Sequence, residues 1–409
     1  MGAEPTPRLR AAVVADDLTG AADSGVQLAR AGYRTAVAFP GAPVPPGTGL
    51  DAVVADTDSR AADTRTAGER VRAAVGALAG APVLLKKVDS TLRGPVAAEI
   101  AAALAASARR AVIVAPAFPG TGRTTADGVQ LVDGAPVHRT RFAADPVAPV
   151  RDAHLPKLLA AEGLEGAPVV RAGDAAALAR ALRDGARAVV ADARTDADLD
   201  ALVAAVPDPS AVLWAGSAGL ARALGAAHPG PAPPPPAAAT ADGRALVVVG
   251  SANVVAREQV VRLVATGVPA VELGLAGLGP EAIAACRAAA RTALENEGAC
   301  VVHPAGPGDG PDLPRRIAAA LGQVAAGLAG AGLVDGLVLT GGDTALSVAR
   351  RLGATGLRVD AELEPGVPIG RLLGPAPYRV VTKAGGFGSP DVLVTACEAL
   401  AGSKRRAFT

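Results

Sequence analysis

The chain has 409 residues, of which 50% are hydrophobic and 19% are charged, so it is long enough for about two domains with sizeable cores. A net charge of +1 and only five Phe, two Tyr and one Trp disfavour nucleic-acid binding, which needs a basic surface or aromatic platforms. No stretch has the pattern of a membrane span or a secretory signal, so the sequence predicts a cytoplasmic protein with no membrane partner.

Four consecutive prolines lie in the segment 229–244, which can form neither a helix nor a sheet ladder. We therefore expect a linker there, between a domain of residues 1–228 and a domain of residues 245–409. On both sides, short Val, Leu and Ala runs alternate with alanine-rich helical stretches. This pattern is typical of α/β domains, each with a largely parallel sheet flanked by helices. Ligands of such sheets bind outside the carboxyl ends of the strands, so function is expected in the loops there.

Acidic residues follow the first predicted strand. Asp16 and Asp17 stand at its end, and a helix that Gly32 terminates comes next. Paired carboxylates at a strand end are costly unless they are solvated, bind a metal or bond to something like a polyol. Another strand is expected to end near Asp56, with Ser59 and Arg60 close behind. Both loops are therefore candidate ligand sites.

A third strand runs into the loop KKVDSTLRG at 86–94, before a helix that starts at Pro95. Because side chains alternate along a strand, Lys87 and Asp89 should share a face while Lys86 points the other way. Together with Ser90 and Arg93, these groups can bind a carboxylate and neighbouring hydroxyls, Arg93 acting as a bidentate clamp. The alternative interpretation is a solvated charged turn, which the close apolar flanks make the weaker one.

Two further polar loops carry no assigned role. The segment 116–128 is rich in Pro and Gly and contains Arg123, Thr124 and Thr125, and the segment 138–145 contains His138, Thr140 and Asp145. A single histidine is more often structural than catalytic, so we assign His138 no function. Cys286, Cys300 and Cys397 are widely spaced, without a metal or redox pattern, and are predicted to be buried thiols.

Three glycine-containing strand-to-helix junctions follow the proline segment. The first has Gly250 and Ser251, with Asn253 placed to cap a helix; the second is TGGDT at 340–344; the third is TKAGGFGS at 382–389, where Ser389 is a natural cap and Pro390 suits a first helical position. Helix N-termini with glycine let a backbone bind phosphate closely. Each junction alone is an ordinary connection, but three in one domain favour a phosphate site.

No junction fits the P-loop pattern GxxxxGK[ST] or the dinucleotide pattern GxGxxG with a later acidic residue. Asp343 therefore needs its own explanation. A carboxylate beside phosphates would repel them unless it holds a metal ion or accepts a hydroxyl proton. It could equally cap a helix that begins at Thr344, and the two roles are compatible.

Taken together, these segments resemble the four-carbon acid sugar kinase family, formerly a domain of unknown function. The matching stretches occur in family order along the whole chain, which makes the resemblance more specific than any one motif. They are ADDLTGAADSGVQLA (15–29), DSR (58–60), KKVDSTLRG (86–94), PAFPGTGRTT (116–125), AGSAGLA (215–221), GSAN (250–253), TGGDTA (340–345), PGVPIG (365–370) and TKAGGFGS (382–389). Pro95, in place of an expected Asn, and HRT at 138–140 depart from the family pattern.

The resemblance implies a sugar-acid kinase, a phosphotransferase with an alcohol acceptor, whose active site lies in a cleft between an acid-sugar-binding and a nucleotide-binding domain. It implies ATP, Mg²⁺ and a small-molecule substrate phosphorylated on its terminal hydroxyl: threonate, erythronate or 3-oxo-tetronate. By position, the acid-sugar site would contain Asp16, Asp17, Ser59, Arg60, Lys87, Asp89, Ser90 and Arg93. ATP would be bound by Ser251, Gly341, Gly342, Asp343, Thr344 and Gly385 or Gly386.

Phosphoryl transfer needs a carboxylate that accepts the proton of the attacking hydroxyl, and the candidates are Asp17, Asp89 and Asp343. The sequence does not separate them, and it leaves the metal ligands, the stereoisomer of the acid and the oligomeric state open, a homo-oligomer included. Two rival hypotheses remain. One is a non-catalytic sensor of nucleotide and sugar acid on the same two domains; the other is a dehydrogenase, which the missing GxGxxG disfavours.

Overall fold

The computed structural model describes residues 9–43, 49–145, 147–231, 243–275, 278–306 and 312–401. Residue contacts divide the chain into two compact units, Met1–Pro234 and Pro235–Thr409. Most of the expected linker at 229–244 lies outside the described residues, so the boundaries 1–228 and 245–409 stay predictions. Each unit is an α/β domain, which confirms the expected fold class.

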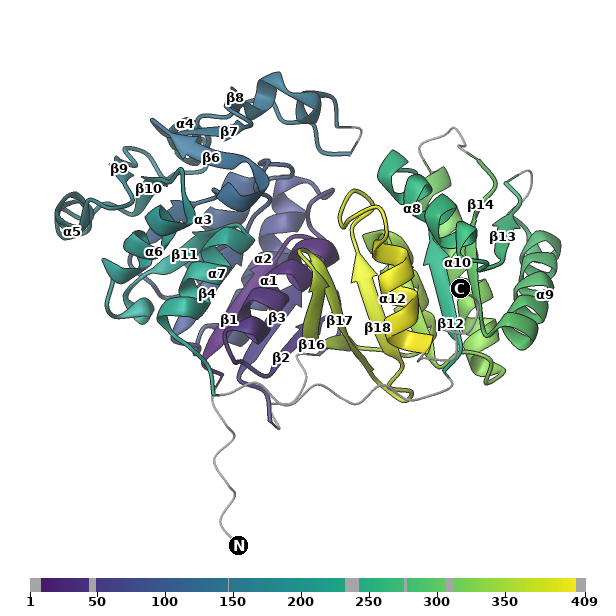
Figure 1. Ribbon diagram of the computed structural model, residues 1–409. Coiled ribbons are helices and arrows are strands. Elements are labelled where there is room, and N and C mark those ends of the chain that lie inside the picture. The colour runs from purple at the N-terminus through teal and green to yellow at the C-terminus, as the bar shows by residue number, and fades with distance from the viewer. Residues whose placement is uncertain are drawn as a thin grey trace, which may run out of the picture. The chain divides into compact units, whose positions relative to one another are not determined.

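The first unit has parallel strands in the order β2-β3-β1-β4-β11-β5-β10-β9 (Figure 1). Helices α1, α6 and α7 cover one face of this sheet, and α2 and α3 cover the other (Figure 1). The strands are β1 (Ala11–Ala15), β2 (Thr35–Ala38), β3 (Ala52–Asp56), β4 (Val83–Lys87), β5 (Val112–Ala115), β9 (Val169–Arg171), β10 (Ala188–Asp192) and β11 (Leu213–Gly216). The helices are α1 (Leu18–Arg30), α2 (Thr64–Leu78), α3 (Val96–Ala106), α4 (Leu155–Ala160), α5 (Ala175–Arg183), α6 (Asp196–Ala204) and α7 (Ala218–Ala227).

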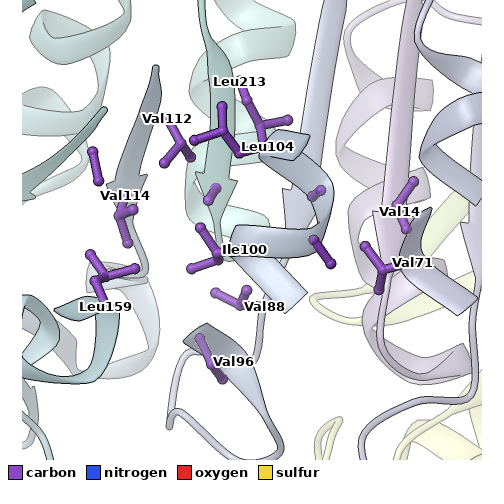
Figure 2. Close-up of a cluster of buried hydrophobic side chains, with 14 of the residues drawn as sticks. Val14, Val71, Val88, Val96, Ile100, Leu104, Val112, Val114, Leu159 and Leu213 are labelled. Atoms are coloured by element: carbon purple, nitrogen blue, oxygen red, sulfur yellow. The ribbon is translucent and has the colours of Figure 1, made fainter. Parts of the chain in front are cut away.

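Burial on both faces explains why the central strands read as continuous apolar runs. Every residue of β1, β3 and β4 is buried. On the face covered by α2 and α3, Val14 of β1, Val71 of α2 and Ile100 of α3 belong to one large hydrophobic cluster (Figure 2). This double cover fixes the sheet, so the loops at the strand ends start from rigid positions.

Helix α1 ends as its sequence indicates. Gly32 adopts a left-handed φ of 89° just after the helix. Its N–H donates to the carbonyl of Ala29, and the N–H of Tyr33 donates to that of Leu28, the paired bonds of a Schellman motif. The expectation for Gly32 is confirmed.

A small antiparallel sheet in the first unit was not predicted. It consists of β6 (Arg123–Ala126), β7 (Val129–Val132) and β8 (Ala135–Pro136), and we call it the β6–β8 sheet. Asp127-Gly128 and Asp133-Gly134 make its turns, and all four residues have positive φ, as two-residue hairpins require. Three short 3₁₀ helices flank the sheet: η1 (Pro119–Thr121), η2 (Val137–Arg139) and η3 (Arg141–Ala144).

The second unit has the strand order β13-β14-β12-β15-β18-β17-β16, parallel up to β18 and antiparallel beyond it. Helices α9, α10 and α11 pack together, and so do α8 and α12 (Figure 1). The strands are β12 (Ala245–Val249), β13 (Ala270–Leu273), β14 (Ala299–Pro304), β15 (Gly336–Thr340), β16 (Gly356–Glu364), β17 (Val367–Leu373) and β18 (Arg379–Lys383). The helices are α8 (Val254–Ala265), α9 (Pro280–Glu297), α10 (Leu313–Gly330), α11 (Gly342–Arg351) and α12 (Val392–Ala401).

Two expected helix starts in this unit are wrong and one is right. Helix α11 begins at Gly342, not Thr344, and Gly341 precedes it without a side-chain cap, so Asp343 is not a capping residue. Helix α12 begins at Val392, because Ser389 bonds to Glu364 through its N–H (2.6 Å) and its hydroxyl (2.7 Å) instead of capping a helix. Asn253 does cap α8, accepting from the N–H of Val255 at 3.0 Å.

The three cysteines are buried and free, as predicted, and burial raises the pKa of Cys286 to about 11 and of Cys300 to about 12. Within the described residues, no helix is both long and apolar enough to cross a membrane. The cytoplasmic location remains a prediction.

Candidate active site

In the first unit, the candidate residues lie at the carboxyl ends of three neighbouring parallel strands. Strand β1 lies between β3 and β4, with Ala15 opposite Asp56 on one side and Lys87 on the other. The loops that follow all three strands therefore leave the sheet at the same level. Strands β2 and β3 lie on one side of β1, whereas β4 and the later strands of this unit lie on the other side. The strand order therefore reverses direction at β1. Such switch points are where open α/β sheets bind ligands.

The guanidinium of Arg60 joins the two carboxylates at the end of β1. Its Nε and Nη2 donate to Asp16 at 2.7 and 3.0 Å, and its Nη1 and Nη2 donate to Asp17 at 2.7 Å each. The backbone N–H of Arg60 also donates to the carbonyl of Asp16. Arg60 is thus the counter-ion of the buried Asp16 and the partly exposed Asp17, and these two carboxylates occupy its N–H donors.

Ser59 faces away from that pair and belongs to a buried network below it. Its hydroxyl donates to Glu99 Oε1 at 2.5 Å and contacts the hydroxyl of Thr57 at 2.7 Å. The other Glu99 oxygen forms an ion pair with Lys86 Nζ at 2.9 Å, where both side chains are almost fully buried. Lys86 Nζ donates further to the carbonyl of Lys87 at 2.7 Å. The network connects the β3 loop, β4 and α3.

The predicted opposition of the two lysines is confirmed. Lys86 points to α3, while Lys87 Nζ lies beside α1, where a Cβ on Gly20 would be 2.8 Å from it and 2.7 Å from Asp17 Oδ1. Lys87 is 4% exposed, and among the described residues it makes no ion pair with a carboxylate. It therefore contributes a positive charge that an anionic ligand can neutralise.

The loop after β4 is held in a strained turn. Asp89 accepts from Arg93 Nε at 2.6 Å and from the hydroxyl of Thr91, and Leu92 between them has a left-handed φ of 58°. Gly94 follows with φ 90°, and a Cβ there would lie 3.1 Å from the carbonyl oxygen of Arg60. The turn is therefore pressed against the β3 loop, which explains the glycine. Part of the Arg93 fork, expected to clamp a ligand carboxylate, is taken by Asp89.

Burial and neighbouring charges shift the pKa values of the carboxyl groups in this site in different directions. Burial acts to raise the pKa of Asp89, but Arg60 and Arg93 outweigh it and hold that pKa well below its usual range. Burial also acts to raise the pKa of Asp16, but the charge of Arg60 helps to outweigh it, and the pKa of Asp16 is lowered. For Asp17, burial and the charge of Asp16 prevail over Arg60, so its pKa is raised. The Asp17 side chain is also 26% exposed, so a ligand can reach it.

In the second unit, three loops meet at the carboxyl ends of β12, β15 and β18. A methyl group on Gly250 would overlap the hydroxyl of Thr344, and one on Gly385 would overlap that of Ser251. Gly341 has a φ of 97°, and its N–H donates to the carbonyl of Lys383. The structure therefore brings Ser251, the 341–344 loop and Gly385 together, and glycine is required because the loops touch. Asp343 lies exposed in the first turn of α11.

A pocket of about 590 Å³ adjoins these loops within the same unit. Its wall is largely apolar and comes from α8, α10 and the end of β14, including Val261, Val264, Pro304, Leu313 and Ile317. The loop residues Gly250, Ser251 and 341–344 form the remaining side. An apolar pocket beside a helix N-terminus suits a molecule with a flat base at one end and phosphates at the other.

Gln259 holds the third loop in place. This buried side chain of α8 directs its Nε2 at three successive carbonyls, those of Phe387 (3.0 Å), Gly388 (3.3 Å) and Ser389 (2.9 Å). Lys383 begins the same loop; burial lowers its pKa to about 8, although Glu364 opposes this. The amine of Lys383 lies 3.4 Å from the carbonyl of Gly385, so this readily titrated group is near Gly385. The backbone carbonyl of Lys383 accepts from the N–H of Gly341.

Sequence reasoning missed several of these features. The pocket wall left no signal, because Val261 and Val264 look like core residues in the sequence, although the structure leaves them 69% and 38% exposed. Glu99, Gln130 and Gln259 left none, because single polar residues in helices or strands reveal nothing about their partners. The contacts of each span well over thirty residues of sequence.

Two family models match this chain, one in each unit. A family model of a sugar-binding N-terminal domain matches residues 11–224, and one of a nucleotide-binding C-terminal domain matches residues 246–393. The chain therefore pairs a sugar-binding domain with a nucleotide-binding domain. It belongs to the four-carbon acid sugar kinase family.

The relatives of this chain match over nearly full length. A D-threonate kinase of Bordetella bronchiseptica is 38% identical, covering 97% of this chain and 98% of its own, and two further D-threonate kinases are 40% and 34% identical. A D-erythronate kinase of Heliobacterium modesticaldum is 31% identical, covering 95% of this chain and 96% of its own. A 3-oxo-tetronate kinase of Methylobacterium radiotolerans is 32% identical, covering 95% and 98%.

Solved structures share the fold. A Salmonella typhimurium crystal structure, described as that of a proposed tRNA synthase, has a TM-score of 0.81 at 25% identity, covering 94% of this chain and 98% of that one. A domain of unknown function from Bordetella bronchiseptica, a domain-swapped dimer with bound citrate, is 37% identical with a TM-score of 0.50, covering 98% and 100%.

We predict that Glu99→Leu destabilises the first unit by about 3–5 kcal/mol, because it leaves the Lys86 ammonium buried without its counter-ion. Glu69→Leu is the matched control, since its ion pair with Arg65 is exposed and should be worth less than about 1 kcal/mol. Urea unfolding followed by the fluorescence of Trp214, the single tryptophan and part of β11, reports on this unit. Equal losses in the two variants would contradict the assigned role of the buried pair.

Proposed function

We propose that this chain is an ATP-dependent kinase that phosphorylates the terminal hydroxyl of a four-carbon sugar acid, and that D-threonate is its substrate. The observation that carries the proposal is the pairing of two built sites in one family: charged strand ends in the sugar-binding unit and converging glycine loops in the nucleotide-binding unit. D-threonate is favoured because kinases of that name are 34–40% identical to this chain, against 31–32% for the erythronate and oxo-tetronate kinases named above.

The first unit has groups suited to a small hydroxylated acid. Carboxylates accept hydrogen bonds from hydroxyls, and the amine of Lys87 can donate to hydroxyl oxygens. The part of the Arg93 guanidinium that Asp89 leaves unused can bind a carboxylate. Citrate bound by the Bordetella bronchiseptica relative, itself a hydroxylated carboxylate, supports this chemistry. Arg60 acts indirectly, because Asp16 and Asp17 occupy its fork and it sets their positions and charge.

The second unit has groups suited to ATP. We assign the adenine to the apolar pocket and the phosphates to the N–H groups at the start of α11, beside Ser251, Gly385 and Gly386. Mg²⁺ bound with the nucleotide would neutralise phosphate charge, and Asp343 is the carboxylate of this loop that could hold it. No cluster of three metal-binding side chains exists among the residues described, so the metal would depend on ATP for most of its ligands.

Asp17 is the best candidate for the proton acceptor among the three aspartates. Asp89 is held by Arg93 and Thr91 and has a strongly lowered pKa, which makes it a poor base. Asp17 is reachable and its pKa is raised by burial and by the charge of Asp16, which makes it a stronger base than Asp89. Phosphoryl transfer then requires the acid and the ATP to be brought together at the moment of reaction.

We predict that the purified chain releases ADP from ATP with D-threonate, and less efficiently or not at all with erythronate and 3-oxo-tetronate stereoisomers. A coupled ADP-release assay over these acids measures kcat/KM for each. The sensor hypothesis predicts binding of both ligands by calorimetry with no ADP release. Absence of ADP release with every four-carbon acid would therefore contradict the kinase proposal.

We predict that Asp17→Asn lowers kcat at least about 100-fold, because general-base catalysis contributes roughly 10²–10⁴-fold. The KM for the acid and the KM for ATP should change little. Asp89→Asn should mainly raise the KM for the acid, since it releases Arg93. Asp343→Asn should mainly affect ATP or Mg²⁺. Steady-state kinetics of the three variants test the assignment, which fails if Asp17→Asn keeps wild-type turnover.

We predict that the KM for ATP rises several-fold as pH increases through about 8, because Lys383 then loses the charge that attracts phosphates. The direction follows from its pKa of about 8: the amine is charged below that pH and neutral above it. Lys383→Arg remains charged across this range and should show a flat profile from pH 7 to 9. An identical rise in that variant would show that another group is responsible.

A further inference from the structure

The β6–β8 sheet is attached to the loop that carries Asp89 and Arg93. Gln130, a buried residue of β7, donates from Nε2 to the carbonyl of Ser90 at 2.7 Å. Its Oε1 accepts from the hydroxyl of Thr125 on β6, also at 2.7 Å. Because Thr125 and Gln130 are directly paired across the two strands, one face of the small sheet is turned toward the candidate acid-sugar site.

Arg123 lies on that same face. It precedes Thr125 by two residues on β6, and side chains two apart on a strand share a side. Its pairing partner Val132 is buried, as are Thr125 and Gln130, so the face is packed against the body of the unit. Arg123 therefore lies on the face of the small sheet that contacts the Asp89–Arg93 loop through Gln130.

The surroundings of Arg123 are charged but leave it incompletely paired. Its Nε is buried and has no hydrogen-bond partner among the described residues, and its Nη1 donates to the carbonyl of Thr121. Within the same residues it forms no ion pair with a carboxylate. Burial lowers its pKa, Asp133 and Asp89 oppose this, and the neighbouring Arg141 and Arg93 add to it. A half-buried guanidinium beside other guanidiniums is stabilised by an anion.

The 3₁₀ segment that follows brings another arginine to the same place. Two guanidiniums contact the ring of Phe142, with Arg93 at 5.5 Å and Arg141 at 5.2 Å from its centre. Arg93 Nη1 lies 3.5 Å from Asp145, which is long for a hydrogen bond, and Arg93 Nε donates to Asp89. Each of the two arginines thus keeps donor capacity that the described residues do not fully use, most clearly at Arg123 Nε.

We propose that Arg123 and Arg93 together bind the carboxylate of the sugar acid, and that the β6–β8 sheet exists to deliver Arg123 to this subsite. The inference rests on the proposed function and deepens it, because it assigns the group that distinguishes an acid from a neutral polyol. Two arginines from different elements fix the carboxylate in orientation as well as charge. The hydroxyl end of the substrate would then extend toward Asp17 and Lys87.

The test compares full-length Arg123→Gln and Arg123→Lys with the wild type, using the sugar acid that the wild type phosphorylates. Arg139→Gln is the matched control, since Arg139 is an exposed arginine of the neighbouring η2. Arg123→Gln should raise the KM for the acid about 10- to 100-fold, the loss of one charge-assisted contact. Arg123→Lys should recover part of this. The KM for ATP, the melting temperature and the inhibition constant of the uncharged four-carbon polyol threitol should stay close to wild type.

Several results would overturn the inference. The first is an unchanged KM for the acid in Arg123→Gln. The second is a loss confined to kcat, which would assign Arg123 to the transferred phosphate. The third is an equal rise in the KM for ATP together with a lowered melting temperature, which would make the role of Arg123 structural. A wild-type chain that phosphorylates no four-carbon acid would instead contradict the proposed function. The two failures are distinguished before any variant is made.

Discussion

The ion pairs of Arg60 with Asp16 and Asp17 are the interaction on which the candidate acid-sugar site depends. Two adjacent carboxylates, one buried and one partly exposed, are costly to keep charged without a cation between them. Arg60 supplies that cation from a different strand loop, and so joins the ends of β1 and β3. Because it satisfies these two residues itself, Lys87, Arg93 and Arg123 are left as the cations that can receive a ligand.

A buried second layer keeps this arrangement in register. Glu99 of α3 binds Ser59 and Lys86, and Gln130 of β7 binds the carbonyl of Ser90. Gln259 does the same for the loop 387–389 in the second unit. In each case a polar side chain on a helix or strand bonds to a backbone carbonyl or a hydroxyl of a loop. These bonds give the polar, glycine-rich loops a defined conformation. The functional loops depend on residues that touch no ligand.

The sequence predicted the features that depend on local pattern. Strand ends with polar loops, the opposite directions of Lys86 and Lys87, the Asn253 cap and the Gly32 helix end all follow from alternation or turn chemistry within a few residues. Wrong predictions arose where a tertiary contact competed with a local one. Ser389 has ideal capping chemistry, yet Glu364 takes its hydroxyl, so α12 starts later.

The features not predicted need several distant segments at once. The apolar pocket draws its wall from α8, β14, α10 and the 341–344 loop, and its valines look like core residues in the sequence. The β6–β8 sheet was hidden because its strands are short, although its two Asp-Gly turns carry a hairpin signal. Arg123 gains a meaning only when that sheet is placed against the loop 89–93.

We propose that one unit holds the sugar acid at the ends of β1, β3 and β4 while the other holds ATP at the ends of β12, β15 and β18. A crystal structure of the chain with D-threonate and a non-hydrolysable ATP analogue tests it most directly. We expect the acid carboxylate at Arg93 and Arg123, and the phosphates at the N-terminus of α11. An acid bound away from Asp17 and Arg93, or phosphates that do not contact residues 341–344, would contradict it.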